Sequence, residues 1–296
     1  MARHFLTGDE LTGAELEGLL ERALELKADR LASRALAGRS VALVFDKPST
    51  RTRVSFETGI YELGGHPLVL REGELQLSRG ESPRDTALVL SRMVHAIGIR
   101  TGPHETVEQL ARHSRIPVIN MLTHEHHPCQ ALADLVTLRE RFGRLDGLKL
   151  AYVGDGNNVA RSLSIATRLA GVELALATPD ELALPELDSV SADEAVRGAH
   201  AVYTDVWISM GDQHDAERKR ELLAPFRLDE SLLAKARDDA VALHCLPAHP
   251  GEEISEGVLY GERSAVWDQA ENRLHTQKAL LELLMYDSQE PGGSDD

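Results

Sequence analysis

Short apolar runs alternate with helical patterns along almost the whole chain, and this alternation limits the fold more than any other feature. Eight runs have the length of buried strands, four in each half of the sequence. Amphipathic stretches separate them, beginning with the helix pattern that follows the Thr12–Glu15 capping box. We therefore predict an α/β fold with two doubly wound parallel-sheet domains joined by long helices. The predicted strands are residues 40–45, 67–70, 95–100, 117–121, 148–153, 173–177, 201–206 and 240–245.

The predicted domain boundary falls at residue 130, so that one domain comprises residues 1–130 and the other 131–268. A long helix over residues 128–142 is expected beside this boundary, with Pro128 suited to its first position. The last amphipathic pattern, about residues 269–286, predicts a helix that packs back on the first domain. Further helices are predicted at residues 83–94, 158–169, 192–199, 216–223 and 231–236.

Composition excludes several classes of protein. The 296 residues carry a formal net charge of −16, which argues against a nucleic-acid partner. Two cysteines in a chain of this length form no disulfide framework and favour a reducing compartment. The first residues lack an apolar core of signal-peptide length, and no apolar stretch is long enough to span a bilayer. We therefore expect a cytoplasmic protein with no membrane partner.

The segment Ser-Thr-Arg-Thr-Arg, residues 49–53, has the features of an anion site. It lies between a predicted buried strand and a helix start, where the unpaired N–H groups of the first helical turn favour negative charge. Its three hydroxyls add donors, and its two guanidinium groups suit the geometry of phosphate. A solvated basic turn is the alternative, but it does not explain the position between strand and helix.

Other polar residues follow the predicted strands, where open parallel sheets place their ligands. Arg100 ends one strand. His127 and Gln130 lie one turn apart on a helix start and could both bind a carbonyl or carboxamide. The neighbouring His124-Glu125-His126 allows a metal site, but the H-E-x-x-H spacing and a supporting thiol pair are missing.

In the second half, Gly-Asp-Gly-Asn-Asn at residues 154–158 resembles the start of a dinucleotide fingerprint. Val159 stands where the third glycine belongs, so we interpret the glycines as a tight turn that presents Asn157 or Asn158. Asp205 and Cys245 end neighbouring predicted strands, and their side chains could bind an amine. A catalytic pair of Cys245 with His244 is disfavoured, because adjacent residues on a strand point to opposite faces.

Together these motifs resemble the ornithine carbamoyltransferases over essentially the whole chain. Residues 45–53 resemble the family's carbamoyl-phosphate loop, and residues 76–82 resemble its second phosphate segment. The His-Pro-Cys-Gln motif at residues 127–130 is shared with the wider carbamoyltransferase superfamily. The segments that point to ornithine rather than aspartate are residues 205–211, 244–247 and 271–273.

The resemblance implies transfer of the carbamoyl group of carbamoyl phosphate to the δ-amine of L-ornithine, giving L-citrulline and phosphate, without metal, cofactor or covalent enzyme intermediate. The implied catalytic residues are Arg100, His127, Gln130, Asp205, Cys245 and Arg273. The residues implied to bind carbamoyl phosphate are Ser49, Thr50, Arg51, Thr52, Gln76, Arg100, His127, Gln130, Cys245, Leu246 and Arg273. Those implied to bind ornithine are Asn158, Asp205, Ser209 and Met210.

By the same resemblance Gln76 serves a neighbouring subunit, which implies a homotrimer or an assembly of trimers. The reaction implies a place in arginine biosynthesis. Three alternatives stay open: another acceptor such as putrescine or an N-acylated ornithine, an inactive regulatory subunit, and a dinucleotide oxidoreductase. The intact Arg51, His127, Asp205 and Cys245 argue against the inactive subunit.

Overall fold

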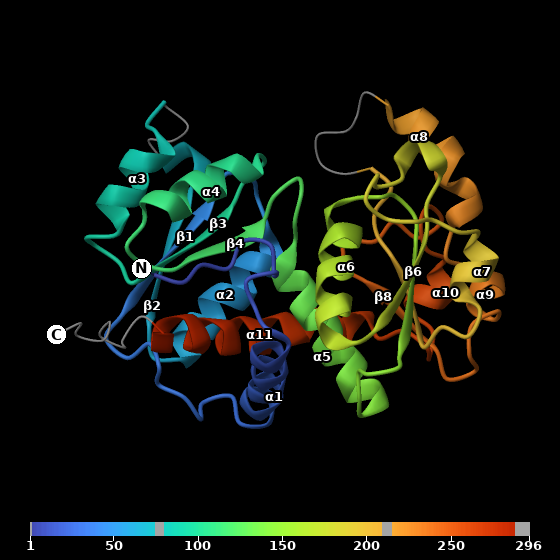
Figure 1. Cartoon of the computed structure of the whole chain (residues 1–296), viewed down its shortest axis with the longest axis horizontal. Coiled ribbons are helices and arrows are strands. Elements are labelled where there is room, and N and C mark those ends of the chain that lie inside the picture. The colour runs from blue at the N-terminus through green and yellow to red at the C-terminus, as the bar shows by residue number, and fades with distance from the viewer. Residues whose placement is uncertain (1, 75–79, 209–214, 288–296) are drawn as a thin grey trace. The chain divides into compact units, whose positions relative to one another are not determined.

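The computed structural model describes residues 2–74, 80–208 and 215–287. The chain forms two compact units (Figure 1). Unit 1 comprises residues 1–133 and 271–296, and unit 2 comprises residues 134–270. Two long helices, α5 (Pro128–Phe142) and α11 (Val266–Asp287), continue along the chain from one unit into the other. The predicted α/β fold, with two parallel sheets and connecting helices, is confirmed.

Unit 1 is built on a four-stranded sheet in the order β2-β1-β3-β4, and every neighbouring pair is parallel. The central strand β1 is buried after its first residue, as its continuous apolar run predicts, whereas the edge strand β2 is largely exposed or half-buried. The strands are β1 (Ser40–Phe45), β2 (His66–Arg71), β3 (Ala96–Arg100) and β4 (Val118–Leu122).

The helices of unit 1 include the C-terminal part of the chain. In Figure 1 helix α11 lies beside α1 (Gly13–Ala28) and α2 (Thr50–Glu62). Two ion pairs hold its C-terminal part in this unit, Arg22–Glu282 to α1 and Lys278–Glu62 to α2. Gly59 of α2 permits this close packing, because a Cβ there would lie 3.1 Å from the Lys278 Cγ. The other helices are α1 (Gly13–Ala28), α2 (Thr50–Glu62), α3 (Pro83–Leu90) and α4 (His104–His113), with a 3-10 turn η1 (Glu72–Glu74).

Unit 2 repeats the parallel architecture with the strand order β6-β5-β7-β8. Its core joins alanine and valine side chains of the sheet to leucines of the surrounding helices. The strands are β5 (Lys149–Val153), β6 (Glu173–Ala177), β7 (Ala201–Thr204) and β8 (Val241–His244). The helices are α6 (Asn158–Ala170), η3 (Asp180–Leu182), α7 (Ala192–Val196), α8 (Ala216–Leu223), η5 (Ala224–Phe226), α9 (Glu230–Leu233) and α10 (Glu256–Leu259).

Several predicted bounds were wrong by a few residues. Strands β7 and β8 end at Thr204 and His244, before the residues that we predicted to close them. Asp205 and Cys245 instead leave the ladder and bond to each other through their side chains. Helix α3 stops at Leu90, and α11 begins at Val266, three residues earlier than predicted.

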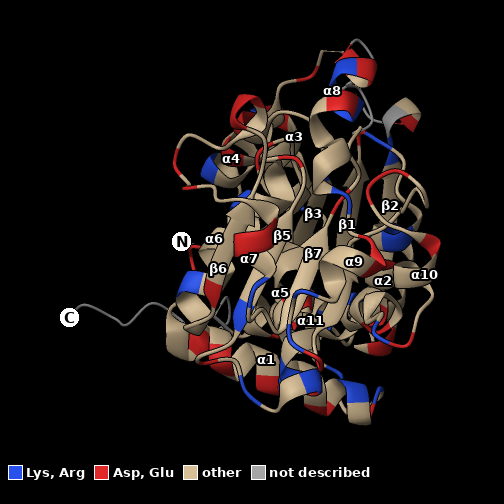
Figure 2. Ribbon diagram, turned by 90° about the vertical axis from the view of Figure 1, so that its right-hand side faces the viewer, with Lys and Arg blue, Asp and Glu red and all other residues tan. Residues whose placement is uncertain are grey.

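Acidic and basic side chains are interspersed along surface helices such as α1 and α8 (Figure 2). Ordinary charge pairs of this kind add little stability, because both partners stay hydrated. Among the residues that the structure describes, no helix combines the length and the apolar character that crossing a bilayer would require.

Candidate active site

In unit 1 the residues of the predicted anion site lie at the carboxyl ends of β1 and β3. Ser49 caps helix α2, with its Oγ accepting the Thr52 N–H at 3.4 Å. The Asp46 N–H donates to the Arg100 carbonyl at 2.9 Å and ties the ends of the two strands together. The start of α2 therefore presents its N–H groups and hydroxyls beside Arg100, as the sequence predicts.

Arg273 of α11 connects helices α2 and α5 through its guanidinium group. Its Nη2 donates to the Thr52 Oγ1 at 2.7 Å, and its Nη1 donates to the Gln130 Oε1 at 3.0 Å. Thr52, Gln130 and Arg273 are all buried. The guanidinium group is thus fixed between the phosphate loop and the His-Pro-Cys-Gln motif, although its residue lies far along the chain.

His127 is the titratable group of this cluster. Burial lowers its pKa well below the usual value, and the positive charges of Arg273, Arg100 and Arg51 lower it further. The imidazole is therefore neutral near pH 7. A neutral ring can donate a hydrogen bond to a carbonyl oxygen, but it brings no imidazolium proton to the reaction.

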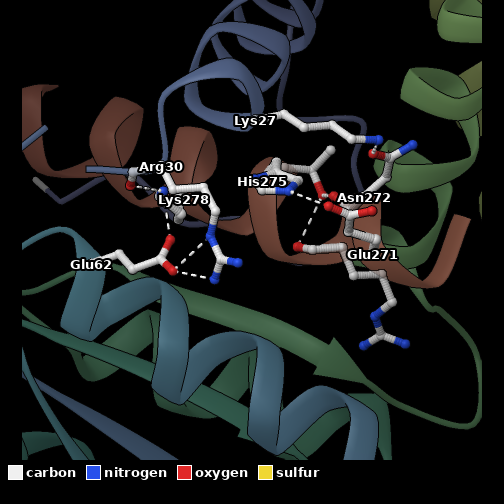
Figure 3. Close-up of polar contacts among 9 residues, drawn as sticks. Lys27, Arg30, Glu62, Glu271, Asn272, His275 and Lys278 are labelled. Atoms are coloured by element: carbon white, nitrogen blue, oxygen red, sulfur yellow. Dashed lines mark hydrogen bonds and ion pairs between the residues drawn. The ribbon is translucent and has the colours of Figure 1, made fainter. Parts of the chain in front are cut away.

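Buried polar contacts hold the segment of α11 that carries Arg273 (Figure 3). Lys278 has a fully buried side chain, and its Nζ donates to the Glu62 Oε2 at 2.8 Å and to the Arg30 carbonyl at 2.5 Å. Burial opposes the ionisation of Glu62, but Arg30 and Lys278 together lower its pKa. On the neighbouring turn, the Lys27 Nζ donates to the Asn272 Oδ1 at 2.8 Å.

A cavity of about 530 Å³ opens beside the phosphate loop within unit 1. Its walls include both acidic and basic side chains, and Arg53 is paired with Glu57 at 3.1 Å. The lining residues from the segment 45–53 are Phe45, Asp46, Lys47, Pro48, Ser49, Thr50 and Arg53.

In unit 2 the candidate site is anionic. Asp205, which is 5% exposed, follows β7. Its Oδ1 accepts from the Cys245 Sγ at 2.9 Å, and its Oδ2 accepts from the Asn157 Nδ2 at 2.8 Å. A thiol that donates to a carboxylate is held as the protonated thiol, so this geometry does not make Cys245 a nucleophile.

The turn after β5 explains how Asn157 reaches Asp205. Gly154 has φ 142°, in the region that favours glycine, and a Cβ on Gly156 would lie 2.2 Å from the Leu182 carbonyl oxygen. The Asn157 Oδ1 caps α6 by accepting the N–H groups of Val159 and Ala160, which leaves its Nδ2 for Asp205. The sequence left Asn157 and Asn158 as alternatives for this turn, and the cap position singles out Asn157 as the partner of Asp205.

Two other predicted arrangements can be compared with the structure. Both ring nitrogens of His244 bond elsewhere, Nε2 to Glu253 and Nδ1 to the Leu246 N–H, so His244 gives Cys245 no base. In the His124–His126 segment, the His124 Nε2 lies 3.1 Å from the Lys47 Nζ, and a Glu125 oxygen accepts the His104 N–H at 3.1 Å.

Ligand atoms of Asp205, His244 and Cys245 lie within 4.8 Å of one another, as do those of His249, Glu252 and Glu253. Such mixed sets suit zinc in principle. In the first set the thiol and the imidazole already make internal hydrogen bonds.

The structure places most of the predicted site residues in two groups. Gln76, Ser209 and Met210 lie outside the described residues. The unit 1 group is Ser49, Thr50, Arg51, Thr52, Arg100, His127, Gln130 and Arg273. The unit 2 group is Asn158, Asp205, Cys245 and Leu246.

Two family models match successive parts of the chain. Residues 3–140 match the family model of the "Aspartate/ornithine carbamoyltransferase, carbamoyl-P binding domain". Residues 146–284 match that of the "Aspartate/ornithine carbamoyltransferase, Asp/Orn binding domain". The chain belongs to the aspartate/ornithine carbamoyltransferase family. The resemblance predicted from the motifs is thus confirmed.

Individual members of the aspartate/ornithine carbamoyltransferase family are similar over nearly the whole chain. The ornithine carbamoyltransferase of Acidothermus cellulolyticus is 52% identical, with 96% of this chain and 97% of that protein covered. The crystal structure of the enzyme from Thermus thermophilus is 43% identical with a TM-score of 0.90, covering 96% and 99% of the two chains. The enzyme from Pyrococcus furiosus is 44% identical with a TM-score of 0.92, covering 96% and 97%.

Proposed function

We propose that the protein transfers the carbamoyl group of carbamoyl phosphate to the δ-amine of L-ornithine, giving L-citrulline and phosphate. The observation that carries this proposal within the family is the Cys245–Asp205 contact in unit 2. A buried carboxylate suits the α-ammonium group of ornithine, whereas aspartate, with its second carboxylate, calls for a cation. The similarity to ornithine carbamoyltransferases over 96% of the chain supports the same choice.

Unit 1 has the groups that carbamoyl phosphate needs. Ser49, Thr50, Arg51 and Thr52 at the start of α2, together with Arg100, are proposed to bind the phosphate. These groups neutralise the charge that grows on the phosphate as it leaves. A cationic cluster of this kind has to act locally, because the whole chain carries a net charge of −16.

The carbamoyl oxygen gains negative charge when the tetrahedral intermediate forms. We assign its stabilisation to the neutral His127, to Arg273 and to the Gln130 amide, the last two of which are hydrogen-bonded to each other. The δ-nitrogen lone pair forms the new C–N bond, the bond from the carbamoyl carbon to the phosphate oxygen breaks, and the amine proton leaves with the phosphate.

Ornithine has to react as the neutral amine. A lysine-like amine has a pKa of about 10.4, so neutralising it at pH 7 costs about 4–5 kcal/mol. Binding of the α-ammonium by Asp205, and of the rest of the amino-acid end by Asn158, Ser209 and Met210, would offset part of that cost.

Assembly, location and pathway are part of the same proposal. We propose a cytoplasmic homotrimer, or an assembly of trimers, that acts in arginine biosynthesis and in which Gln76 completes the site of a neighbouring subunit. Neither cysteine forms a disulfide within the described residues, which fits a reducing compartment. Measurement of the molecular mass in solution tests the trimer, and a mass equal to one chain would contradict it.

The decisive experiment measures carbamoyl transfer to several amines. L-Ornithine, putrescine, an N-acylated ornithine and aspartate are compared under steady-state conditions with carbamoyl phosphate held constant. We expect kcat/KM to be at least about 100-fold higher for ornithine, since only ornithine offers both the α-ammonium and the free δ-amine. Faster turnover of another amine would make that amine the acceptor substrate in place of ornithine. Absence of product with all four would support the alternative of an inactive regulatory subunit.

A further inference from the structure

The loop that carries Cys245 is organised around a carboxylate that the proposed reaction does not use. Glu253 is 0% exposed, and its Oε1 lies 3.2 Å from the His244 Nε2. The same carboxylate accepts the backbone N–H of His249. Its own backbone carbonyl accepts the Leu228 N–H at 2.8 Å, which anchors Glu253 to the core of unit 2.

The hydrogen bonds fix the tautomer of His244. A backbone N–H can only donate, so the His244 Nδ1, at 2.8 Å from the Leu246 nitrogen, has to be an acceptor without a proton. The ring proton of the neutral imidazole is therefore on Nε2, where it points at the Glu253 Oε1. Without an acceptor at position 253, the opposite tautomer would turn an N–H toward the Leu246 N–H.

Hydrogen bonds hold the chain on both sides of Cys245, and the one on the Leu246 side depends on this tautomer. On one side the backbone N–H of His244 donates to the Gln269 Oε1 at 2.8 Å, and Gln269 in turn donates to Asp134 at 2.7 Å. On the other side Leu246 has φ 60°, a conformation that a leucine seldom adopts unless its surroundings impose it. The hydrogen bond from the Leu246 N–H to His244 is such a constraint, and Cys245 lies between the two anchored residues.

Stability alone is a poor reason for this arrangement. A buried carboxylate beside an imidazole loses hydration that apolar side chains of similar size would not need, so such pairs seldom add net stability. Moreover, the second oxygen, Glu253 Oε2, has no hydrogen-bond partner within the described part of the chain and lies 3.7 Å from the His249 Nδ1. The group is well placed for one task, which is to orient the His244 ring.

We propose that Glu253 is a positioning residue for the acceptor substrate: it fixes the tautomer of His244, which shapes the 244–246 turn and holds the Cys245 thiol against Asp205. The inference rests on the proposed function, because its consequence is tighter use of ornithine. It predicts that Glu253 acts only as a hydrogen-bond acceptor, so that an uncharged acceptor can replace it.

The test compares three variants. Glu253→Met keeps the side-chain length but removes the acceptor, Glu253→Gln keeps an oxygen acceptor, and Glu252→Met is the matched control on the neighbouring carboxylate, which is paired with Arg220 instead. We expect Glu253→Met to lower kcat/KM for ornithine by about 30-fold and to change KM for carbamoyl phosphate by less than about twofold. Glu253→Gln and Glu252→Met should stay within about threefold of the original protein.

Cysteine labelling gives a readout that does not depend on catalysis. Cys129 is buried, and burial raises its pKa to about 12, so iodoacetamide should report on Cys245 alone. Labelling should quicken in Glu253→Met and stay unchanged in Glu253→Gln. Three outcomes would overturn the proposal. The first is that Glu253→Met impairs the use of both substrates equally, and the second is that Glu253→Gln is as impaired as Glu253→Met. The third is that the labelling rate is unchanged in all variants.

A second pair of variants leaves Glu253 in place, in case Glu253→Met fails to fold. His244→Asn keeps an oxygen that can accept the Leu246 N–H, as asparagine does in Asx-turns, whereas His244→Ala removes it. We expect the labelling rate of Cys245 to stay within about threefold in the first and to rise by about tenfold or more in the second. Equal labelling rates in the two variants would contradict the role of the His244 ring as the acceptor that holds Leu246. If the original protein forms no citrulline, the proposed function fails, while labelling still decides the role of Glu253.

Discussion

The two units share one topology but present opposite charges at the ends of their strands. In each unit the first strand is central, the second is at the edge, and the third and fourth follow on the other side. In unit 1 the positive charges of Arg51, Arg100 and Arg273 surround His127, whereas in unit 2 Asp205 accepts from Cys245 and Asn157. We infer that the side chains following the strands, and not the strand order, determine which ligand each sheet would bind.

The largest effect should come from removing charge in unit 1. Arg51→Ala takes away the charge-assisted contact to the phosphate that we propose for both the bound substrate and the transition state. One such hydrogen bond is worth about 1.5–3 kcal/mol, and loss of a leaving-group contact adds to it, so kcat/KM should fall by about 1,000-fold or more. Steady-state kinetics with varied carbamoyl phosphate measure the effect.

The control for Arg51→Ala is Arg112→Ala, which removes an exposed arginine from the last turn of α4. It should leave turnover nearly unchanged. Near-normal kinetics in Arg51→Ala would mean that the start of α2 is not part of the active site. The proposed difference in charge between the sites of the two units would then lose its cationic half.

The next effect concerns the anionic side. Asp205→Asn keeps the size of the side chain but removes the charge that we assign to the α-ammonium of ornithine. We expect kcat/KM for ornithine to fall by about 100-fold while KM for carbamoyl phosphate changes by less than about threefold. Putrescine has no α-amino group, so its poor use should change much less.

Asp193→Asn serves as the control for this variant, because Asp193 is an exposed carboxylate of unit 2 that pairs with Lys235. If Asp205→Asn lowered kcat/KM equally for ornithine and putrescine, Asp205 would not bind the α-ammonium group of ornithine. A large loss of carbamoyl phosphate affinity would mean that the two units do not divide the substrates as proposed.

These two sites differ in how far the sequence could predict them. The residues of the proposed phosphate site lie within a few positions of one strand and one helix, so local patterns were enough to predict their place in the fold. The Asp205–Cys245 contact was harder, because the pattern predicted strands through both residues, whereas both ladders end one residue earlier and the side chains meet. Short apolar runs define where a strand lies but not where its last hydrogen bond forms.

Long-range partners were beyond reach without the resemblance. Arg273 meets Thr52 across more than two hundred positions, and no periodicity links them. Glu253 lies nine residues after His244, the last residue of β8, and their contact depends on the intervening loop, whose path the sequence pattern does not predict. Asn157 is an intermediate case, since its cap position was predictable but its second contact, to Asp205, was not.

The third prediction uses pH to separate the two units. The folded-state pKa of His127 lies below that of the unfolded chain, near 6.5, because of burial and of the three neighbouring arginines. Below that value the unfolded chain binds one more proton, so the free energy of unfolding falls with decreasing pH, by up to about 1.4 kcal/mol per pH unit for this residue. His4 and His275 of unit 1 also have lowered pKa values, both chiefly because of burial. In unit 2 the pKa of His200 is lowered, again chiefly because of burial.

Acid should therefore destabilise unit 1 more than unit 2. Hydrogen exchange, read peptide by peptide at pH 7.5 and 5.5, measures the difference. His127→Gln keeps a donor and an acceptor without a titrating ring, and it should reduce the acid sensitivity of unit 1 only. Equal loss of protection in both units, or a gain in unit 1 on acidification, would contradict the assignment.

The smallest effect lies in the two helix caps beside the sites. Ser49 caps α2 with a single long hydrogen bond of 3.4 Å, whereas Asn157 caps α6 with two, of 2.9 and 3.2 Å. Asn157→Ala should therefore lower the free energy of unfolding by about 1–2 kcal/mol, and Ser49→Ala by about 0.5 kcal/mol. Urea unfolding measures both, with Thr12→Ala at the capping box of α1 as a control remote from either site.

In unit 1 the cap variant should affect the kinetics more than the stability. A weak cap leaves the Ser49 hydroxyl and the first N–H groups of α2 available to a phosphate, so Ser49→Ala should raise KM for carbamoyl phosphate more than its small effect on stability suggests. Asn157→Ala should raise KM for ornithine, because Asp205 loses one of its two donors. If Ser49→Ala instead cost as much stability as Asn157→Ala and left KM unchanged, Ser49 would be an ordinary cap. The start of α2 would then bind phosphate, if at all, through Arg51 and the backbone alone.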